Sequence, residues 1–431
     1  MKKSVFNIVE KIEEGILLYN TNSNSILKLD QEYKEKYYKF LQTGKVEDNL
    51  FREALLRGNM IVEEEFGDEV EKLFLENKIA RFGGNSIGLT IAPTMSCNFR
   101  CPYCYEKGRE YVTMSKETVE KVKEYFVNLK EHYHNIGITW YGGEPLLAVP
   151  IIEELMKSVY NNFSCENVSA NVITNGYLLT EDVVRKMKEF NISNIQITID
   201  GPPEIHNKRR CLPSGEDTFF VILTNMRKAL EIYPELRISI RVNIDKSNVD
   251  GVDKIIQYLE KYDLVNRTFL YLAPVTNINE TCTEGSCFNT REFAKEELSF
   301  FKRNGEKGYS FINLPQRNVA MCGAVSSNSC IIDARGDLYK CWDDVSNLDE
   351  KVGSLYDKSS SMNANLVKWL SHTIENDEEC RNCPYLPVCM GGCPNYWIKN
   401  KKKNCVSIKE SSNQFVRLVY DIEKQRKKRS V

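Results

Sequence analysis

The 431-residue chain has no apolar stretch of the ~18–20 residues that a membrane-spanning helix needs. Glu10 and Lys11 interrupt the first residues, which excludes the apolar core of a signal peptide. The chain has no internal repeat of fixed period and no low-complexity linker. Its formal net charge is −2, so no large nucleic-acid-binding surface is expected. These absences predict a cytoplasmic protein without nucleic-acid or membrane partners.

Cysteine, by contrast, is abundant. The chain has 15 cysteines, and in a reducing cytoplasm such a number indicates metal binding rather than disulfides. Most of them lie between Cys282 and Cys405, which predicts a separate, metal-rich C-terminal domain. The apolar share of 42% and the charged share of 27% are typical of a globular protein, and the length suffices for two or three domains.

Three cysteines, Cys97, Cys101 and Cys104, follow an apolar run that is typical of a strand. Three thiolates on one short loop can hold three irons of a cubic four-iron cluster and leave the fourth iron without a protein ligand. An iron with an open position can bind a substrate or cofactor and pass it an electron. A zinc site and a disulfide are the alternatives. Zinc needs four ligands, and a disulfide leaves one cysteine unpaired.

The CxxxCxxC spacing resembles the signature loop of the radical S-adenosylmethionine (SAM) enzymes. The resemblance implies that Cys97, Cys101 and Cys104 are the catalytic cluster ligands and that SAM chelates the open iron. One electron would then break a sulfonium C–S bond and release a 5′-deoxyadenosyl radical. The resemblance also places the ring of Tyr103 against the adenine, a role that is compatible with simple packing over the cluster.

Strand and helix patterns alternate from residue 87 to about residue 275. Strands are predicted at residues 87–94, 136–141, 170–174, 195–200, 237–244 and 268–275. Apolar residues at helical spacing predict a helix over residues 117–132, and Thr180 is a candidate N-cap for a later helix. Six such units predict an α/β fold with a parallel sheet. The family resemblance implies a partial, TIM-like (β/α)6 barrel, with ligands at the carboxyl ends of its strands.

Two further motifs follow strand ends. The run from Tyr141 to Pro145 resembles the GGEP motif of radical SAM enzymes, which implies that Gly142, Gly143 and Glu144 contact the SAM ammonium group. The stretch that begins at Thr198 resembles the S/T-x-D-G…H…R motif of peptide- and protein-modifying members. It implies that the Thr198 hydroxyl and the Arg210 guanidinium bind the SAM carboxylate. His206 in this motif is expected to make a structural hydrogen bond rather than to act in catalysis.

Other barrel residues are candidates for the same pocket. Asn175 would form a polar wall after the third strand, and Leu272 on the sixth strand would pack on the adenine. Arg241 and Asn243 are two residues apart on the fifth strand, so they share one face. They would meet SAM or substrate if that face points inward; a buried ion pair is the alternative.

The C-terminal cysteines have the arrangement G-x4-C…C-x2-C-x5-C-x3-C…C, which resembles the SPASM domain with its two auxiliary four-iron clusters. The resemblance implies that the first auxiliary cluster is bound by Cys322, Cys330, Cys341 and Cys393. It implies that the second is bound by Cys380, Cys383, Cys389 and Cys405. If Cys330 is not a ligand, the first cluster has an open iron for a substrate thiolate. A pair of zinc ribbons is the alternative.

Four cysteines lie outside these sets. Cys165 and Cys211 are expected to be ordinary small residues. Cys282 and Cys287 lie in the connecting segment, where they would be ordinary residues, touch substrate or form a redox pair.

The first ~85 residues contain no barrel pattern. Apolar runs at 15–19 and 25–29 flank a polar turn and predict a hairpin, with helices over 33–41 and 68–76. This layout resembles the peptide-recognition domains of maturases that act on ribosomally made peptides, which add a leader strand to a sheet edge. A cap on the barrel is the alternative. The predicted domains are 1–85 (peptide recognition), 86–276 (radical SAM core), 277–315 (connecting segment) and 316–431 (SPASM).

Three [4Fe-4S] clusters, one of them SAM-binding, together with a leader-binding module predict a particular enzyme. It would be a maturase that installs a cross-link, a thioether from cysteine sulfur to carbon, in a ribosomally synthesised precursor peptide of the sactipeptide or ranthipeptide type. Family analogy adds a low-potential electron donor, ferredoxin or flavodoxin. The alternatives are an anaerobic sulfatase-maturating enzyme that forms formylglycine and a non-catalytic, zinc-binding regulator.

Overall fold

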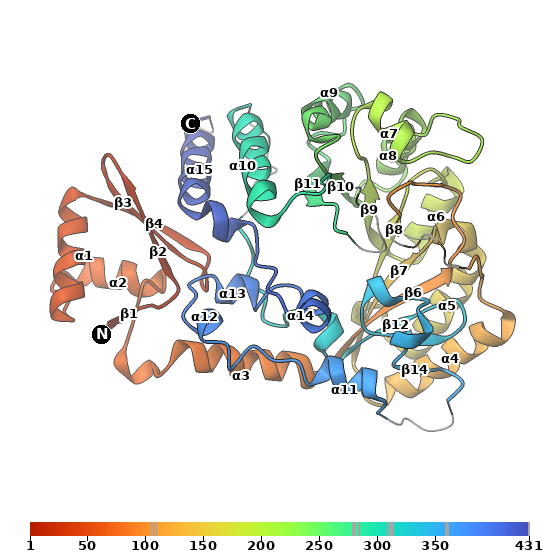
Figure 1. The fold of residues 1–431 in the computed structure, drawn as a ribbon, viewed down its shortest axis with the longest axis horizontal. Helices are drawn as coiled ribbons and strands as arrows, with labels where there is room; N and C mark the ends of the chain where they lie inside the picture. Colours follow the sequence, from red (N-terminus) through yellow and green to blue (C-terminus); the bar gives the residue numbers. More distant parts are fainter. Residues whose placement is uncertain are drawn as a thin grey trace. The chain divides into compact units, whose positions relative to one another are not determined.

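The computed structural model describes residues 1–104, 106, 108, 110–277, 282, 285–307, 309, 314–357 and 362–429. Residues 278–281, 283–284, 308 and 310–313 of the predicted connecting segment lie outside the described residues. The chain divides into two compact units (Figure 1). Unit 1 comprises Met1–Gly83, Thr290–Cys322 and His372–Val431, and unit 2 comprises Gly84–Asn289 and Gly323–Ser371. The predicted domain boundaries stay a prediction.

Unit 2 is built on six parallel strands in sequential order, which confirms the predicted α/β fold with a central parallel sheet (Figure 1). The strands are β6 (Ser86–Thr94), β7 (Asn135–Gly142), β8 (Val168–Thr174), β9 (Ile192–Thr198), β10 (Arg237–Ile244) and β11 (Thr268–Pro274). All six lie where the sequence places them, although β8 and β9 begin two and three residues earlier than predicted. The cysteine loop follows β6, and the Gly-Gly turn ends β7, so both lie at the carboxyl edge of the sheet.

Helices connect these strands. They are α4 (Lys116–Lys130), α5 (Val149–Asn162), α6 (Glu181–Glu189), α7 (Pro203–Arg209), α8 (Phe219–Ile232) and α9 (Val252–Lys261). Helix α4 begins one residue before and ends two residues before the predicted helix, and Ser115 caps it by accepting a hydrogen bond from the N–H of Thr118. Thr180 caps α6 as predicted, accepting from the N–H of Val183 at 3.4 Å.

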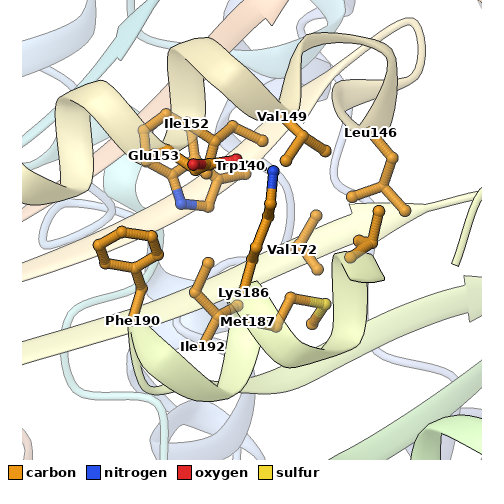
Figure 2. Close-up of a pocket in the computed structure, with 11 residues that line it drawn as sticks. Trp140, Leu146, Val149, Ile152, Glu153, Val172, Lys186, Met187, Phe190 and Ile192 are labelled. Carbon is orange, nitrogen blue, oxygen red and sulfur yellow. Dashed lines mark hydrogen bonds and ion pairs between the residues drawn. The ribbon is translucent and has the colours of Figure 1, made fainter. Parts of the chain in front are cut away.

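The two faces of the sheet differ in polarity. In β10 the isoleucines and the valine at every second position are buried, while Ser239, Arg241 and Asn243 lie on the opposite face. Figure 2 shows how the apolar face is filled, in a small cleft between α5, α6 and the sheet. Trp140 and Phe190 line this cleft, which therefore belongs to the helix–sheet core.

The sheet continues beyond β6 with three short strands that were not predicted. They are β12 (Ser329–Ile332), β13 (Asp337–Tyr339) and β14 (Gly353–Ser354), of which β12 pairs parallel to β6 and the other two pair antiparallel. Helix α11 (Ala364–Leu370) completes the described elements of unit 2. Two predicted auxiliary-cluster ligands, Cys330 and Cys341, lie on or next to this extension.

Unit 1 begins with the predicted hairpin, which is part of a three-stranded antiparallel sheet in the order β2-β3-β4. Its elements are β1 (Lys2–Lys3), β2 (Asn7–Ile12), β3 (Gly15–Asn20), β4 (Ser25–Asp30), α1 (Gln31–Thr43), α2 (Asn49–Arg57), β5 (Ile61–Val62) and α3 (Glu69–Phe82). A small core that includes Ile16, Leu18, Tyr37 and Phe40 packs the first helices on the sheet.

The rest of unit 1 is helical. It contains α10 (Thr290–Glu306), α12 (Glu378–Arg381), α13 (Leu386–Cys389), α14 (Pro394–Asn400) and α15 (Ile408–Arg429). Helix α10 lies within the predicted connecting segment, where no helix was expected. None of the helices in the described ranges is both long and apolar enough to cross a membrane.

Candidate active site

Two glycines let the end of β7 approach the backbone that enters the cysteine loop. The N–H of Gly143 donates to the carbonyl of Thr94 at 3.2 Å, and the N–H of Glu144 donates to the carbonyl of Ser96 at 2.9 Å. A Cβ on Gly143 would lie 2.5 Å from the carbonyl oxygens of Met95 and Ser96, closer than any real side chain comes. Gly142 has a φ of +118° and meets the same backbone. The Gly-Gly turn therefore fixes the start of the cysteine loop.

Replacement of Gly143 by alanine is expected to lower the free energy of unfolding by about 1–3 kcal/mol, because backbone rather than a flexible side chain must move. Thermal unfolding and the iron bound per chain measure the effect. Gly88→Ala on β6 is the matched control, since a Cβ there meets no atom within 4 Å. Equal melting temperatures of the two variants would contradict this role of Gly143.

The cysteine loop is held by its own backbone and by neighbouring loops. The N–H of Phe99 points to the Cys97 sulfur at 3.4 Å, and the N–H of Arg100 donates to the carbonyl of Cys211 at 2.8 Å. Burial raises the pKa of Cys97 to about 12 and of Cys101 to about 11, while the positive charge of Arg210 acts against both shifts. Bound iron would supply the charge that deprotonates such thiols. The three thiols with a nearby cation fit an iron–sulfur cluster.

The Glu144 carboxylate is held by hydrogen bonds within the protein. The side chain is fully buried and accepts hydrogen bonds from the Thr174 hydroxyl at 2.7 Å and from the N–H of Asn175 at 2.7 Å. Burial raises the pKa of Glu144, although these bonds oppose the shift. Asn175 in turn donates to the Asn98 side chain at 2.8 Å, beside Cys97. Glu144 and Asn175 thus join β8 to the cysteine loop; their predicted contacts with SAM stay predictions.

Asp200 connects a group of polar and charged side chains next to this loop, a role that the sequence analysis missed. Its side chain is completely buried, accepts a short hydrogen bond from the Tyr103 hydroxyl and accepts from the N–H of Asn243 at 3.1 Å. The Nε of Arg209 lies 3.6 Å from the same carboxylate, and its Nη1 donates to Asp245 at 2.8 Å. Asp200 and Asp245 follow β9 and β10, and this position at the carboxyl edge was the available signal.

Arg210 lies in the same group. Its Nη1 donates to the Tyr103 hydroxyl at 3.0 Å, and its guanidinium carbon lies 5.7 Å from the centre of the Phe99 ring. Burial lowers the pKa of Arg210, but the neighbouring Tyr103, Cys101 and Asp200 raise it, and the pKa lies above its usual value. The Nε of Arg210 is buried without a hydrogen-bond partner. An unsatisfied, charged donor of this kind fits the carboxylate of a bound SAM.

The remaining barrel residues divide between the two faces of the sheet. Thr198 pairs in register with Arg241, so both lie on the polar face, and the Nε of Arg241 donates to Asn243 at 2.8 Å. Leu272 pairs in register with Val242, on the opposite, apolar face. The structure therefore brings Thr198, but not Leu272, to the polar side of the barrel. A cavity of about 330 Å³ lies on the sheet and is lined in part by Asn171, Asn194, Gln196, Ser239 and Phe269.

His206 makes the structural hydrogen bond that was expected of it. The imidazole is completely buried, and its Nδ1 accepts from the N–H of Asp200 at 3.3 Å. Burial, together with the charges of Arg210 and Arg209, holds the pKa of His206 well below its usual value. The ring is therefore neutral and supports Asp200.

The four cysteines expected to bind the second auxiliary cluster lie around one cavity of unit 1. They are Cys380, Cys383, Cys389 and Cys405. Asp377 caps α12 by accepting from the N–H of Cys380 at 2.9 Å, and the Lys409 ammonium lies 3.8 Å from the Cys405 sulfur. Burial raises the pKa of Cys380 to about 12. Four thiols around one enclosed space, with a cation beside them, fit an iron–sulfur cluster.

The four cysteines expected to bind the first auxiliary cluster are not assembled within either unit. Cys322 and Cys393 belong to unit 1, and Cys330 and Cys341 belong to unit 2. Tyr125 lies on α4, and its pKa is raised by burial and by the nearby Cys330 thiol. Cys330 therefore lies near α4. This ligand set stays a prediction.

No group of three or more His, Cys, Asp or Glu side chains that could hold a metal ion is found among the residues that the structure describes. A cubic cluster binds each thiolate through a different iron, so its ligands need not converge on one ion.

Residues 91–259 match the family model of the radical SAM superfamily. The chain therefore contains a radical SAM domain over these residues and is an enzyme. The family implies a [4Fe-4S] cluster and SAM as cofactors.

Curated relatives include anaerobic sulfatase-maturating enzymes and a radical SAM cyclopropyl synthase. The cysteine-type anaerobic sulfatase-maturating enzyme of Clostridium novyi (strain NT) is 27% identical over 350 residues, which cover 74% of this chain and 90% of that protein. The radical SAM cyclopropyl synthase TigE of Paramaledivibacter caminithermalis is 20% identical over 438 residues, which cover 90% of this chain and 88% of that protein.

Two solved structures share the fold. Native anSMEcpe with bound AdoMet has a TM-score of 0.60 at 20% identity. The matched region covers 78% of this chain and 99% of the anSMEcpe chain. Streptococcus suis SuiB bound to precursor peptide SuiA has a TM-score of 0.55 at 13% identity. The matched region covers 94% of this chain and 98% of the SuiB chain.

Proposed function

We propose that this enzyme is a cytoplasmic maturase that modifies a ribosomally synthesised precursor peptide and installs a thioether between a cysteine sulfur and a carbon atom. Three [4Fe-4S] clusters serve the reaction, one that binds SAM and two auxiliary clusters. A low-potential ferredoxin or flavodoxin supplies the electron.

The observation that carries the proposal is the N-terminal module of unit 1. Its strand β4 pairs with β3 on one side and with no other strand among the described residues. An open edge of this kind accepts an extended peptide through main-chain hydrogen bonds. Helices α1, α2 and α3 follow the sheet directly, as in the peptide-recognition domains that this layout resembles. The module supports recognition of a leader peptide.

The extent of the likenesses also supports a peptide substrate. SuiB, crystallised with its precursor peptide, and TigE correspond to 94% and 90% of this chain. The sulfatase-maturating relatives correspond to 74% and 78%, so about a fifth or more of this chain has no counterpart in them. A chain that only matured sulfatases would have no evident use for the additional part.

Each residue group has a role in the proposed reaction. Cys97, Cys101 and Cys104 hold the SAM-binding cluster, and the Arg210 guanidinium binds the SAM carboxylate. When bound, these cofactors supply the radical that removes a hydrogen atom from an unactivated carbon of the peptide. Formation of a stable thioether also removes one electron from the substrate, for which the auxiliary clusters are suitable acceptors. Asp200 and Arg209 hold Tyr103 in place and keep its hydroxyl from water.

A second candidate is the oxidation of a sulfatase cysteine or serine to formylglycine. It is favoured by the sulfatase-maturating relatives and by the structure of anSMEcpe with a bound cysteine peptide. The two products are chemically distinct. Formylglycine carries an aldehyde that a hydrazine reagent captures, whereas a thioether does not react.

The test is anaerobic co-expression of the enzyme with a short, cysteine-containing candidate peptide, which is sought among the reading frames beside its gene. Mass spectrometry is expected to show the loss of two hydrogen atoms per linkage and to map each linkage to one cysteine. An unmodified peptide in a preparation that still cleaves SAM would contradict the proposal. Hydrazine capture from a sulfatase peptide, without modification of the precursor, would favour the second candidate.

The proposed cluster number gives a prediction that does not need the substrate. The reconstituted enzyme is expected to contain about twelve irons, and Cys389→Ser is expected to reduce this to about eight. Cys389 lines the cavity of unit 1 with the other three cysteines of its set. Cys165→Ser is the control, because Cys165 is exposed and lies outside both cysteine arrays. The same iron content in both variants would remove Cys389 from the ligand set.

A further inference from the structure

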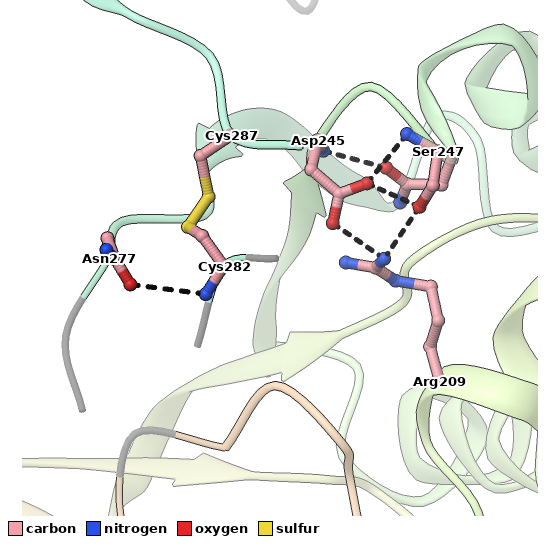
Figure 3. Close-up of a disulfide and its surroundings, with 7 residues drawn as sticks. Arg209, Asp245, Ser247, Asn277, Cys282 and Cys287 are labelled. Atoms are coloured by element: carbon pink, nitrogen blue, oxygen red, sulfur yellow. Dashed lines mark hydrogen bonds and ion pairs between the residues drawn. A yellow bond between two sulfur atoms is a disulfide. The ribbon is translucent and has the colours of Figure 1, made fainter. Parts of the chain in front are cut away.

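Two cysteines that belong to none of the cluster sets are joined in a disulfide. Cys282 and Cys287 have Cα atoms 5.8 Å apart, in the usual range for this bond (Figure 3). Both side chains are partly exposed. The backbone thus brings the two sulfurs together at a place that small thiols and peptides can reach.

This disulfide is attached to the carboxyl edge of the barrel, next to the active-site group. The carbonyl of Ser286, one residue before Cys287, accepts a hydrogen bond from the N–H of Lys246 at 3.0 Å. Lys246 follows Asp245, whose carboxylate binds Arg209 at 2.8 Å. On the other side, the N–H of Cys282 donates to Asn277 at 3.3 Å, just beyond the end of β11. Figure 3 shows the disulfide and the Arg209–Asp245 pair in one view.

A purely structural role fits this disulfide poorly. Only four residues separate the two cysteines, and such a short loop constrains the unfolded chain less than a long one. Disulfides in reducing compartments are usually transient and act in catalysis or redox sensing. Exposed disulfides are also the ones that exchange most easily with thiols.

We infer that Cys282 and Cys287 form a thiol–disulfide exchange site, which keeps the cysteines of the peptide substrate reduced for modification. The inference rests on the proposed function, because a thioether can form only from a free cysteine thiol. The position at the carboxyl edge of β10 and β11 places the exchange at the end of the barrel where substrates bind.

The exchange balances as two substitutions at sulfur. In the dithiol form, one enzyme thiolate attacks a disulfide of the peptide, which forms a mixed disulfide and releases one peptide thiolate. The second enzyme thiolate attacks the mixed disulfide, forms the Cys282–Cys287 bond and releases the other peptide thiolate. Two electrons pass from the enzyme pair to the peptide. Two molecules of a low-molecular-weight thiol then return the pair to the dithiol form and leave as their own disulfide.

A single proteolytic fragment reports the redox state of the pair. Cleavage after Arg267 and Arg291 releases a peptide that contains Cys282, Cys287 and no other cysteine. The reconstituted enzyme is equilibrated anaerobically in buffers of reduced and oxidised glutathione, alkylated, digested and weighed. We expect the fragment to change from unalkylated to doubly alkylated across these buffers. A pair that stays oxidised in all of them is a structural cross-link and overturns the inference.

The exchange itself is measured with the acetyl-Gly-Cys-Gly-amide peptide in its disulfide-linked dimeric form. The pre-reduced enzyme is expected to reduce this probe at least about tenfold faster than the double variant Cys282→Ser/Cys287→Ser. In at least one single variant, the fragment with the remaining cysteine is expected to carry the probe as a mixed disulfide. Cys165→Ser is the control and is expected to match the unmodified enzyme.

Equal rates in the double variant and the control would overturn the inference, provided that circular dichroism shows both to be folded. If the double variant does not fold, the glutathione titration of the unmodified enzyme decides alone. Neither assay contains SAM or a precursor peptide. Failure of the exchange site is therefore distinguishable from failure of the proposed maturase reaction.

Discussion

Replacement of Cys101 by alanine is expected to reduce SAM cleavage by about 1,000-fold or more. Cys101 is the central member of the three-cysteine loop, and burial raises its pKa to about 11, so only a bound metal would keep it as a thiolate. Without this ligand the loop can hold two irons at most, and the cluster is lost. The measurement is 5′-deoxyadenosine formed by the anaerobically reconstituted enzyme with SAM and dithionite.

Cys211→Ser is the matched control for this substitution. The Cys211 thiol donates to the carbonyl of Arg100 at 3.2 Å, within the same loop, but it is not part of the CxxxCxxC motif. We expect this variant to form 5′-deoxyadenosine within about threefold of the unmodified enzyme, as for other small changes of a half-buried side chain. Equal formation by the Cys101 and Cys211 variants would show that the loop does not hold the catalytic cluster.

The central sheet could be predicted because its signals are local. The strand β10 has the predicted bounds, since its apolar residues alternate without interruption and Pro and Gly are absent from it. The strands β12, β13 and β14 could not be predicted in the same way. They are two to four residues long, and β12 joins the sheet by pairing with β6, which is distant in sequence. No local pattern specifies such a pairing.

The candidate site shows the same limit. The cysteine loop and the Gly-Gly turn were found by spacing, because each lies in one segment. The Asp200–Arg209–Asp245 group was missed because it joins side chains from two different connections of the barrel, and Tyr103, which bonds to Asp200, comes from a third. The assignment of Leu272 to the adenine pocket depended on which face of β11 it occupies. The pairing of Leu272 with Val242 on β10 shows which face of the sheet Leu272 occupies. The sequence of β11 alone does not show this.

Replacement of Asp200 by alanine is expected to lower the free energy of unfolding by about 3–5 kcal/mol and to abolish SAM binding. The carboxylate is completely buried, and its removal leaves Arg209 with one carboxylate partner and Arg210 with the Tyr103 hydroxyl alone. The N–H of Asn243 and the Tyr103 hydroxyl would also lose their acceptor. Denaturant unfolding and calorimetric titration with SAM, both under anaerobic conditions, measure these effects.

Two further variants separate the charge of Asp200 from its shape. Asp200→Asn retains an oxygen that can accept from Asn243 but removes the negative charge between the arginines, so we expect a smaller loss of stability with a similar loss of SAM affinity. Asp217→Ala removes an exposed carboxylate and is expected to change stability by about 0.5 kcal/mol or less. If Asp200→Ala were as stable as Asp217→Ala, the buried arginines would not depend on Asp200. If Asp200→Asn bound SAM normally, hydrogen bonding alone, without charge, would hold Tyr103 and Arg210 in place.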